Sequence, residues 1–211
     1  MTTLRCVKLP EDAQGLFEVL YHRADPERKR RAERYLHRED GLRCMAAGEL
    51  LRQTLEWALG ITEFTVVKEP GGKPRIDGLE DFHFNLSHSG DRVVIAWGDS
   101  PVGVDVQEMR MDAGKEALAK RFFTGEEYDY IFEQPELAQD RFYQVWTGKE
   151  SYLKYLGTGI TRSLDSFSIL SPEIERMLRL WYLPDGCCVS LCTTDQNCIF
   201  ELDDRFFSIK E

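Results

Sequence analysis

The chain has 211 residues, of which 42% are hydrophobic and 11% aromatic, so it can bury a substantial core as one large domain or two small ones. Its 37 acidic and 27 basic residues give a formal net charge of −10, which argues against a general nucleic-acid-binding protein. No apolar run reaches membrane-spanning length and the start of the chain lacks a secretion-signal pattern, so we expect a cytoplasmic protein without a membrane partner.

Helical patterns come before strand patterns in the first half of the chain. Helices are expected over residues 10–23, 26–38 and 42–59. A strand over residues 62–67 and the loop "EPGGKPR" follow, since Gly-Gly and Pro leave little room for regular structure. Three further strands, connected by tight turns as in an antiparallel meander, are expected over residues 82–87, 92–97 and 102–107.

The second half of the chain repeats this order. Helices are expected over residues 113–123, 126–132 and 140–156. Strands are expected over residues 166–170, 178–183, 187–193 and 198–203. Helices followed by strands, twice over, predict an α+β fold with two similar halves, which we place at residues 1–110 and 111–211.

The six cysteines show neither a regular disulfide spacing nor the C-x2-C pairs that are typical of zinc sites. Four of them lie in "CCVSLCTTDQNC" near the C-terminus. In a chain without a secretion signal this pattern favours small reduced side chains packed in paired strands.

Positive charge is concentrated between Arg28 and Arg43, where seven basic residues stand against three acidic ones. A local basic patch on an acidic protein suggests a small anionic ligand or a confined acidic docking surface. The alternative is a solvated helix face with ion pairs such as Glu27 to Arg31, and composition alone leaves both interpretations open.

The strand pattern "VGVDVQ" places one carboxylate inside an apolar alternation. Because side chains in a strand alternate between faces, Asp105 and Gln107 share one face while Val104 and Val106 share the other. An unpartnered buried carboxylate is costly, so the face of Asp105 is either hydrated or neutralised by a cation.

A second charged group lies in the helical segment "FYQVWTGKESYLKYLGTGI". Glu150 and Lys154 are four residues apart and share a helix face, and an exposed ion pair is the simplest interpretation. If Asp105 and Glu150 meet instead, a divalent cation such as Mg²⁺ between them would relieve their repulsion, and Lys154 would serve the same phosphate. That combination predicts a pyrophosphate site, with Gln107 as a neutral oxygen ligand or the holder of a bound water.

Two further segments carry polar side chains that could serve a site. In "FNLSHSGD", adjacent Ser87, His88 and Ser89 face alternately and cannot form a catalytic triad. His88 is a candidate phosphate or sugar contact, with a turn-stabilising histidine as the alternative. In "RFFTGEEY", Thr124 and Glu127 match a helix capping box, which is the preferred interpretation of that segment alone.

The segments "GKP", "FNLSHS", "VGVD", "RFFTGEEY" and "WTGKESYLKYLGTG" occur in one order that resembles the Sfp-type 4′-phosphopantetheinyl transferases. The similarity covers about residues 26 to 170. It implies two similar α/β halves related by a pseudo-twofold axis, with coenzyme A bound between them. The implied activity moves the phosphopantetheine arm of coenzyme A onto a serine of an acyl or peptidyl carrier protein and releases 3′,5′-ADP.

The resemblance also implies roles for individual residues. Asp105 and Glu150 would be metal ligands, with Gln107 in place of a third carboxylate that many members carry. Lys154 would contact the pyrophosphate, and Glu127 would help to deprotonate the carrier serine. The remaining implied contacts are to the 3′-phosphate, from Arg28, Arg31, Arg43 and His88, and to the adenine and ribose, from Lys73, Pro74 and Ser87.

Two other functions remain open from the sequence. Gln107 removes one negative charge from the metal site, so a coenzyme A-binding or carrier-docking protein without catalysis is the first alternative. An unrelated metal-dependent phosphohydrolase is the second. A chain with two similar halves needs no second copy to complete its cleft, so we expect a monomer.

Overall fold

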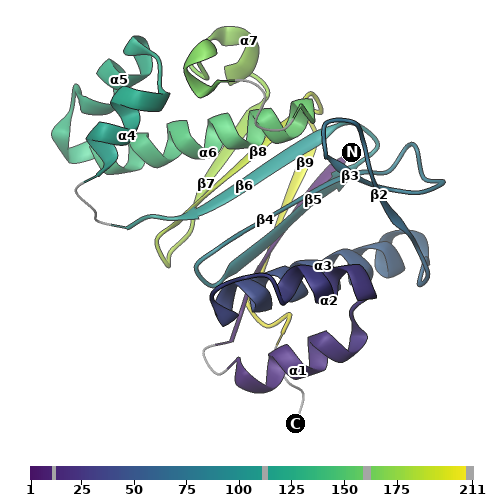
Figure 1. The fold of residues 1–211 in the computed structure, drawn as a ribbon. Helices are drawn as coiled ribbons and strands as arrows, with labels where there is room; N and C mark the ends of the chain where they lie inside the picture. The colour runs from purple at the N-terminus through teal and green to yellow at the C-terminus, as the bar shows by residue number, and fades with distance from the viewer. Residues whose placement is uncertain (11–12, 111–113, 159–162, 208–211) are drawn as a thin grey trace.

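The computed structural model describes residues 1–10, 13–110, 114–158 and 163–207 (Figure 1). The helices are α1 (Gln14–Arg23), α2 (Pro26–Ala32), α3 (Arg38–Leu59), α4 (Lys115–Phe122), α5 (Gly125–Phe132), α6 (Ala138–Leu156) and α7 (Pro172–Glu175). The strands are β1 (Thr2–Lys8), β2 (Val66–Lys68), β3 (Pro74–Ile76), β4 (His83–Ser89), β5 (Arg92–Gly98), β6 (Val102–Glu108), β7 (Leu178–Tyr182), β8 (Cys187–Thr193) and β9 (Cys198–Asp203). The fold is therefore mixed α and β, as expected.

The main strands form two sheets, with strand orders β4-β5-β1-β9 and β6-β8-β7, and β2 pairs with β3 in a separate hairpin. The pairing of β9 with β1 is parallel and the other main pairings are antiparallel. Thus β9, near the end of the chain, completes the sheet that β1 begins, and β6 pairs with β8 from the second half. The pairing of strands crosses the division at residue 110, and a boundary between the halves stays a prediction.

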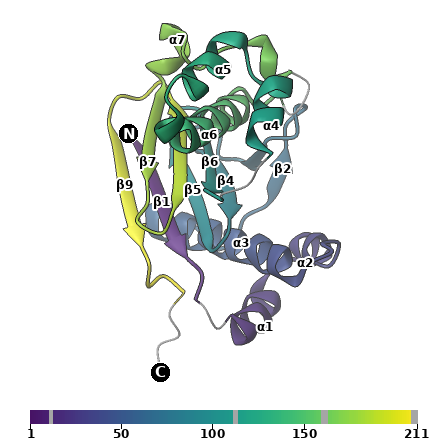
Figure 2. The same cartoon turned by 90° about the vertical axis from the view of Figure 1, so that its left-hand side faces the viewer.

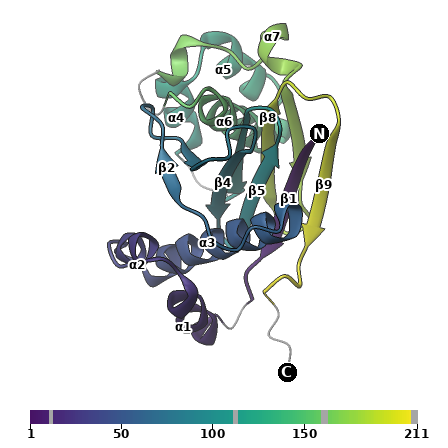
Figure 3. The ribbon, with the colours of Figure 1, turned by 90° about the vertical axis from the view of Figure 1, so that its right-hand side faces the viewer.

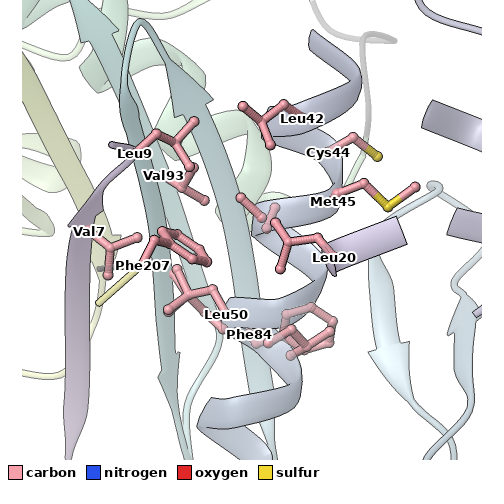
Figure 4. Close-up of a cluster of buried hydrophobic side chains, with 14 of the residues drawn as sticks. Val7, Leu9, Leu20, Leu42, Cys44, Met45, Leu50, Phe84, Val93 and Phe207 are labelled. Carbon is pink, nitrogen blue, oxygen red and sulfur yellow. The ribbon is translucent and has the colours of Figure 1, made fainter. Parts of the chain in front are cut away.

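Three apolar cores separate four layers, which are helices α1 to α3, the four-stranded sheet, the three-stranded sheet and helices α4 to α7. Leu42, Met45 and Leu50 of α3 pack on Val93 and other side chains of the four-stranded sheet (Figure 4). A second core lies between the two sheets and contains Leu4, Cys6, Val94, Val104, Val106, Val189 and Leu191. The third core packs α5, α6 and the residues before α7 against the three-stranded sheet.

The helices therefore lie on the two outer sides of the paired sheets. Figures 2 and 3 show α1, α2 and α3 on one side and α4, α5, α6 and α7 on the other. None of the helices in the described ranges has the length and hydrophobicity that crossing a bilayer requires.

Most expected elements are present, and three predictions are wrong. The helix expected to run to residue 38 ends at Ala32, and α3 begins at Arg38, because the chain turns between them and packs Tyr35 on the core. The third strand of the expected meander, β6, is not hydrogen-bonded to β5. It lies beside β4, where side chains make the links: the Val104 amide donates to Asn85 Oδ1 at 2.9 Å.

The strand expected over residues 166–170 is the third error. Residues Leu164–Ser166 form a short 3-10 turn, and no strand follows before β7 in this described part of the chain. Phe167 and Ile169 are buried as the alternation predicts, but their backbone groups bond to side chains: the Phe167 carbonyl accepts from Lys149 and the Ile169 amide donates to Glu127.

Candidate functional site

The site is built where α6 lies directly against β6. A Cβ atom on Gly103 would be 2.0 Å from the carbonyl oxygen of Ser151 and 2.3 Å from the amide nitrogen of Tyr155. No side chain fits in that space, so a glycine in β6 allows this close approach. The contact aligns Asp105, two residues further along β6, with the polar side chains of α6.

Gly103→Ala is therefore expected to destabilise the protein by about 3 kcal/mol or more, because the new methyl group would meet backbone atoms that cannot move aside. Activity should fall with it, since α6 must shift away from β6. Gly125→Ala is the matched control, because a Cβ there meets nothing within 4 Å. Denaturant unfolding of both variants checks the prediction, and equal midpoints would contradict it.

Asp105 is buried, with 2% of its surface exposed, and both oxygens of its carboxylate accept hydrogen bonds. Its Oδ1 accepts from Ser87 Oγ at 2.8 Å and from Lys154 Nζ at 2.7 Å. Its Oδ2 accepts from Gln107 Nε2 at 3.2 Å. The predicted sharing of one face by Asp105 and Gln107 is confirmed, and the cation that neutralises this carboxylate in the structure is the Lys154 ammonium.

Lys154 thus does not form the simple exposed pair with Glu150 that helical spacing suggests. Its Nζ donates to Ser87 Oγ at 3.1 Å and to the Val104 carbonyl at 3.0 Å, in addition to Asp105. These bonds link α6 to both β4 and β6. They hold a positive charge at the point where the two sheets meet.

Glu150 is the second carboxylate of the site. Burial raises the pKa of its carboxyl group, the nearby charge of Asp105 raises it further, and Lys154 opposes both effects. The packing of α6 on β6 thus brings Glu150 near enough to Asp105 for their charges to interact. That the two carboxylates bind one metal ion stays a prediction.

The two neighbouring carboxylates fit a divalent cation. Carboxylate oxygens are hard ligands that Mg²⁺ prefers, and a cation would relieve the repulsion from Asp105 that, after burial, raises the Glu150 pKa. Gln107 now turns Nε2 to Asp105 and Oε1 to Ser89, so its amide would have to rotate to offer its oxygen to the same cation. In the described residues no group of three or more His, Cys, Asp or Glu side chains is placed to hold a metal. Substrate and water oxygens would have to supply the other ligands.

A pocket of about 400 Å³ opens beside this group. Its walls come from α3, from the end of β4 and the following turn, from the end of β6, and from α6. The lining residues are Asp40, Arg43, His88, Ser89, Gly90, Gln107, Glu108, Arg110 and Tyr143. Arg43 is fixed there, since its Nε donates to the Gly90 carbonyl at 2.6 Å and its Nη1 to Asp40 at 2.7 Å.

His88 has a strongly basic environment. Burial and, after it, the charges of Arg43, Lys154 and Arg31 together lower the pKa of its imidazole to about 4, while Asp40 opposes them. The structure therefore brings His88, Arg43 and Arg31 close enough for their charges to interact, and their role in a phosphate site stays a prediction. Such a concentration of positive charge is suited to an anion.

Because the pKa of His88 falls from 6.5 to about 4 on folding, acid should destabilise the protein through this residue. Between those pH values the unfolded chain binds a proton that the folded chain does not, so stability is full above pH 6.5 and falls as the pH approaches 4. The loss should reach about 3 kcal/mol. Denaturant unfolding of wild type and His88→Gln across this range should show a weaker pH dependence in the variant.

Arg28 lies at the edge of this region. Its Nη1 donates to the Cys44 carbonyl at 2.9 Å, and its side chain covers Gly48, where a Cβ would be 2.2 Å from Arg28 Cδ. Asp25 caps α2 by accepting from the Arg28 amide, which fixes the start of this basic helix. Glu27, which the alternative interpretation paired with Arg31, instead lies 3.9 Å from Lys68.

The loop with Lys73 and Pro74 contacts the start of β6 and the C-terminal end of α6. Lys73 Nζ donates to the carbonyls of Val102 and Tyr155, at 2.8 and 3.1 Å, and burial lowers its pKa. Gly71 lies so close to the C-terminus of α6 that a Cβ would be 1.7 Å from the Gly157 carbonyl oxygen. Any ligand contact by this loop would use its backbone, since the Lys73 ammonium is engaged.

Glu127 has a different environment from the other candidates. It is fully buried, and the capping box with Thr124 is confirmed. Its carboxylate pairs with Lys149 at 2.7 Å, and both side chains are fully buried. Its role as the base for the carrier serine stays a prediction, which this burial does not favour, because a base must reach the proton it removes.

Several residues of the site were missed from the sequence. Lys149 was overlooked beside Glu150, although a lysine within an amphipathic helix is a recognisable signal. Arg110 and Tyr143 line the pocket, and the Arg110 amide donates to the Tyr143 hydroxyl at 2.9 Å. No spacing rule connects positions so far apart in the chain.

Comparison with known proteins gives the same family over both parts of the chain. A family profile described as "4′-phosphopantetheinyl transferase superfamily" matches residues 101–198, and one described as "4′-phosphopantetheinyl transferase, N-terminal" matches residues 10–99. These two segments contain most of the residues described above.

Bacillus proteins are among the curated relatives. A 4′-phosphopantetheinyl transferase of Bacillus subtilis is 38% identical over 147 residues, which are 68% of this chain and 64% of that protein. The transferase psf-1 of Bacillus pumilus is 38% identical over 174 residues, or 80% of this chain and 73% of its own. The transferase Sfp of Bacillus subtilis strain 168 is 35% identical over 147 residues, or 68% and 65% of the two chains.

The matched segments thus span slightly less than two thirds of two of these relatives and 73% of the third. The chain belongs to the Sfp-type 4′-phosphopantetheinyl transferase family.

Proposed function

We propose that the protein transfers the 4′-phosphopantetheine arm of coenzyme A to a serine of an acyl or peptidyl carrier protein, in a Mg²⁺-dependent reaction that releases 3′,5′-ADP. The observation that carries this proposal is the close packing of α6 on β6 at Gly103, which brings Glu150 near enough to Asp105 for their charges to interact, beside a pocket that includes Arg43 and His88. The names of the relatives and the resemblance support the substrate class.

Asp105 and Glu150 would hold the metal, with Gln107 as a neutral ligand or the holder of a bound water. The metal, when bound, neutralises negative charge on the pyrophosphate of the substrate. Lys154 would release one oxygen of Asp105 and turn its ammonium to the same phosphates. Transfer of a phosphoryl group depends mainly on positioning and charge neutralisation, and these side chains are suited to both.

The pocket beside the metal site would take the 3′-phosphate of coenzyme A. Arg43 and Arg31 supply its positive character beside His88, and Arg28 contacts the carbonyl of Cys44, the residue after Arg43. The backbone of Lys73 and Pro74 would follow the adenine and ribose, together with Ser87. A bound phosphate would raise the pKa of His88, since an anion favours the protonated imidazole.

We further propose that the fold comprises two halves related by a pseudo-twofold axis, each a sheet covered by one long helix, and that the protein acts as a monomer in the cytoplasm. The equivalent positions of α3 and α6 on the outer sides of the two sheets support the symmetry (Figure 1).

The test is to incubate the protein with coenzyme A, Mg²⁺ and several apo carrier proteins, and to measure the mass of each carrier. We expect at least one carrier to gain a phosphopantetheine group, and the gain to vanish when EDTA removes the metal. No mass change with any carrier would reject transfer. Formation of 3′,5′-ADP in step with the modified carrier would establish the leaving group.

A second function has one observation in its favour. Gln107 leaves the metal site one carboxylate short, which weakens attraction for a divalent cation. A coenzyme A-binding or carrier-docking protein without catalysis would bind coenzyme A and leave every carrier unmodified. Calorimetric binding measured with the same samples separates the two functions.

Carrier proteins of this class are acidic around the modified serine, so a basic or apolar patch beside the coenzyme A site is the expected docking surface, and the basic helix α2 is the candidate. The Michaelis constant for the carrier should therefore rise as salt is added, because salt screens exposed charges. Initial rates at increasing NaCl concentrations check this prediction, and a Michaelis constant that does not change with salt would contradict it.

A further inference from the structure

A buried ion pair joins α5 to α6 at the residue next to Glu150. Glu127 of α5 and Lys149 of α6 are both fully buried, and their charged atoms are 2.7 Å apart. Phe123 and Phe167 pack against the ammonium, with their ring centres 5.8 and 4.4 Å from Lys149 Nζ. Burying two charges is costly unless further hydrogen bonds compensate, so the surroundings of each group show what the pair does.

The Glu127 carboxylate takes all of its hydrogen bonds from within the protein. Oε2 accepts from Lys149 Nζ, from the Thr124 amide at 2.9 Å and from Thr124 Oγ1 at 3.2 Å, and Oε1 accepts from the Ile169 amide at 2.8 Å. The side chain is fully buried, so the carboxylate has no exposed surface for a substrate to reach.

The Lys149 ammonium has no proton left to donate. An ammonium has three protons to donate. They go to Glu127, to the Leu164 carbonyl at 2.7 Å and to the Phe167 carbonyl. The pair therefore joins the start of α5, the middle of α6 and the segment 164–169, which has no strand partner of its own.

The pair also sets the orientation of α6 about its axis. Lys149 and Glu150 are consecutive, so their side chains point about 100° apart around the helix. On the side of Lys149, Ile169 packs so closely that its Cδ1 would be 3.0 Å from a Cβ on Gly148. Fixing that side of the helix fixes the direction of Glu150 on the neighbouring side.

We propose that Glu127 and Lys149 are positioning residues, which hold α5 and segment 164–169 against α6 and thereby direct Glu150 toward Asp105, and that Glu127 removes no proton from the substrate. This inference rests on the proposed function for its kinetic consequences. Its structural part, the direction of Glu150, is measurable through metal binding without any transfer reaction.

The experiment compares wild type with Glu127→Gln, Lys149→Met and the double variant Glu127→Gln/Lys149→Met, all assayed well below their melting temperatures. The matched control is Glu116→Gln/Lys120→Met, which neutralises an exposed ion pair of α4. Measured are kcat, the Michaelis constant for coenzyme A, and the affinity for Mn²⁺ in the presence of 3′,5′-ADP.

A positioning role predicts that Lys149→Met lowers kcat at least tenfold and weakens Mn²⁺ binding severalfold, while the Michaelis constant for coenzyme A stays within about twofold. The double variant removes both buried charges together, so its kcat should recover to within about tenfold of wild type. The control variant should match wild type in all three measurements.

The opposite result would identify Glu127 as the base. In that case Glu127→Gln and the folded double variant would both lose about 10²- to 10⁴-fold in kcat, because loss of a general base lowers the rate by that much. Mn²⁺ binding unchanged in Lys149→Met would also overturn the inference. If wild type transfers nothing, the proposed function fails, while the Mn²⁺ result still decides the positioning role.

A pH profile gives the same decision if the double variant does not fold. Lys149→Met removes the positive charge that lies 2.7 Å from the Glu127 carboxylate. If Glu127 were the base, the acidic limb of the kcat profile of Lys149→Met would move to higher pH. A limb at the wild-type position, with kcat lowered throughout, supports positioning.

Discussion

Glu150→Gln is expected to lower the rate of phosphopantetheine transfer by about 10²- to 10³-fold or more, while the protein stays folded. Glutamine has the shape of glutamate but lacks the charge that a divalent cation requires, and here Gln107 already supplies one neutral group in place of a carboxylate. Glu150 is only partly buried and its pKa is raised by burial and by Asp105, so neutralising it should not destabilise the fold.

The measurement is the rate of carrier modification at saturating coenzyme A, together with Mn²⁺ affinity and the melting temperature. Glu136→Gln is the control, since Glu136 is exposed on the short turn before α6. Turnover close to wild type in Glu150→Gln would remove Glu150 from the metal site. An unchanged melting temperature or a slight increase is expected, because the repulsion from Asp105 is lost.

Lys149→Met is expected to lower the free energy of unfolding by about 3–5 kcal/mol, the largest stability effect among the charged residues of the site. The substitution leaves Glu127 buried with an uncompensated charge, in a core where both side chains are fully buried. It also leaves the carbonyls of Leu164 and Phe167 without this donor.

Denaturant unfolding measures the loss, and Lys120→Met serves as the control because its exposed pair with Glu116 should contribute less than about 1 kcal/mol. Glu127→Gln/Lys149→Met should be more stable than Lys149→Met, since it also removes the buried charge of Glu127. A loss below about 1 kcal/mol in Lys149→Met would contradict the account of this core.

The sequence by itself determined most helices and strands and the identity of the acidic and basic groups. Helical spacing located α3 and α6, which end at Gly60 and Gly157 as expected for glycines that adopt a left-handed conformation. Alternation in β6 correctly separated the valines, which enter the core between the sheets, from Asp105 and Gln107. These features follow from the local periodicity of apolar residues, which can be read directly from the sequence.

Only the tertiary structure decided how these groups are partnered. It paired β6 with β8 instead of β5, replaced the strand expected over residues 166–170 by a segment bonded to Lys149 and Glu127, and gave Asp105 the ammonium of Lys154. In each case the two partners are at least 40 residues apart in the chain or lie in different layers. The bond between Lys149 and Phe167 is the exception. The energy of a buried charge depends on such distant neighbours, so local pattern identified the charged residues and packing assigned their roles.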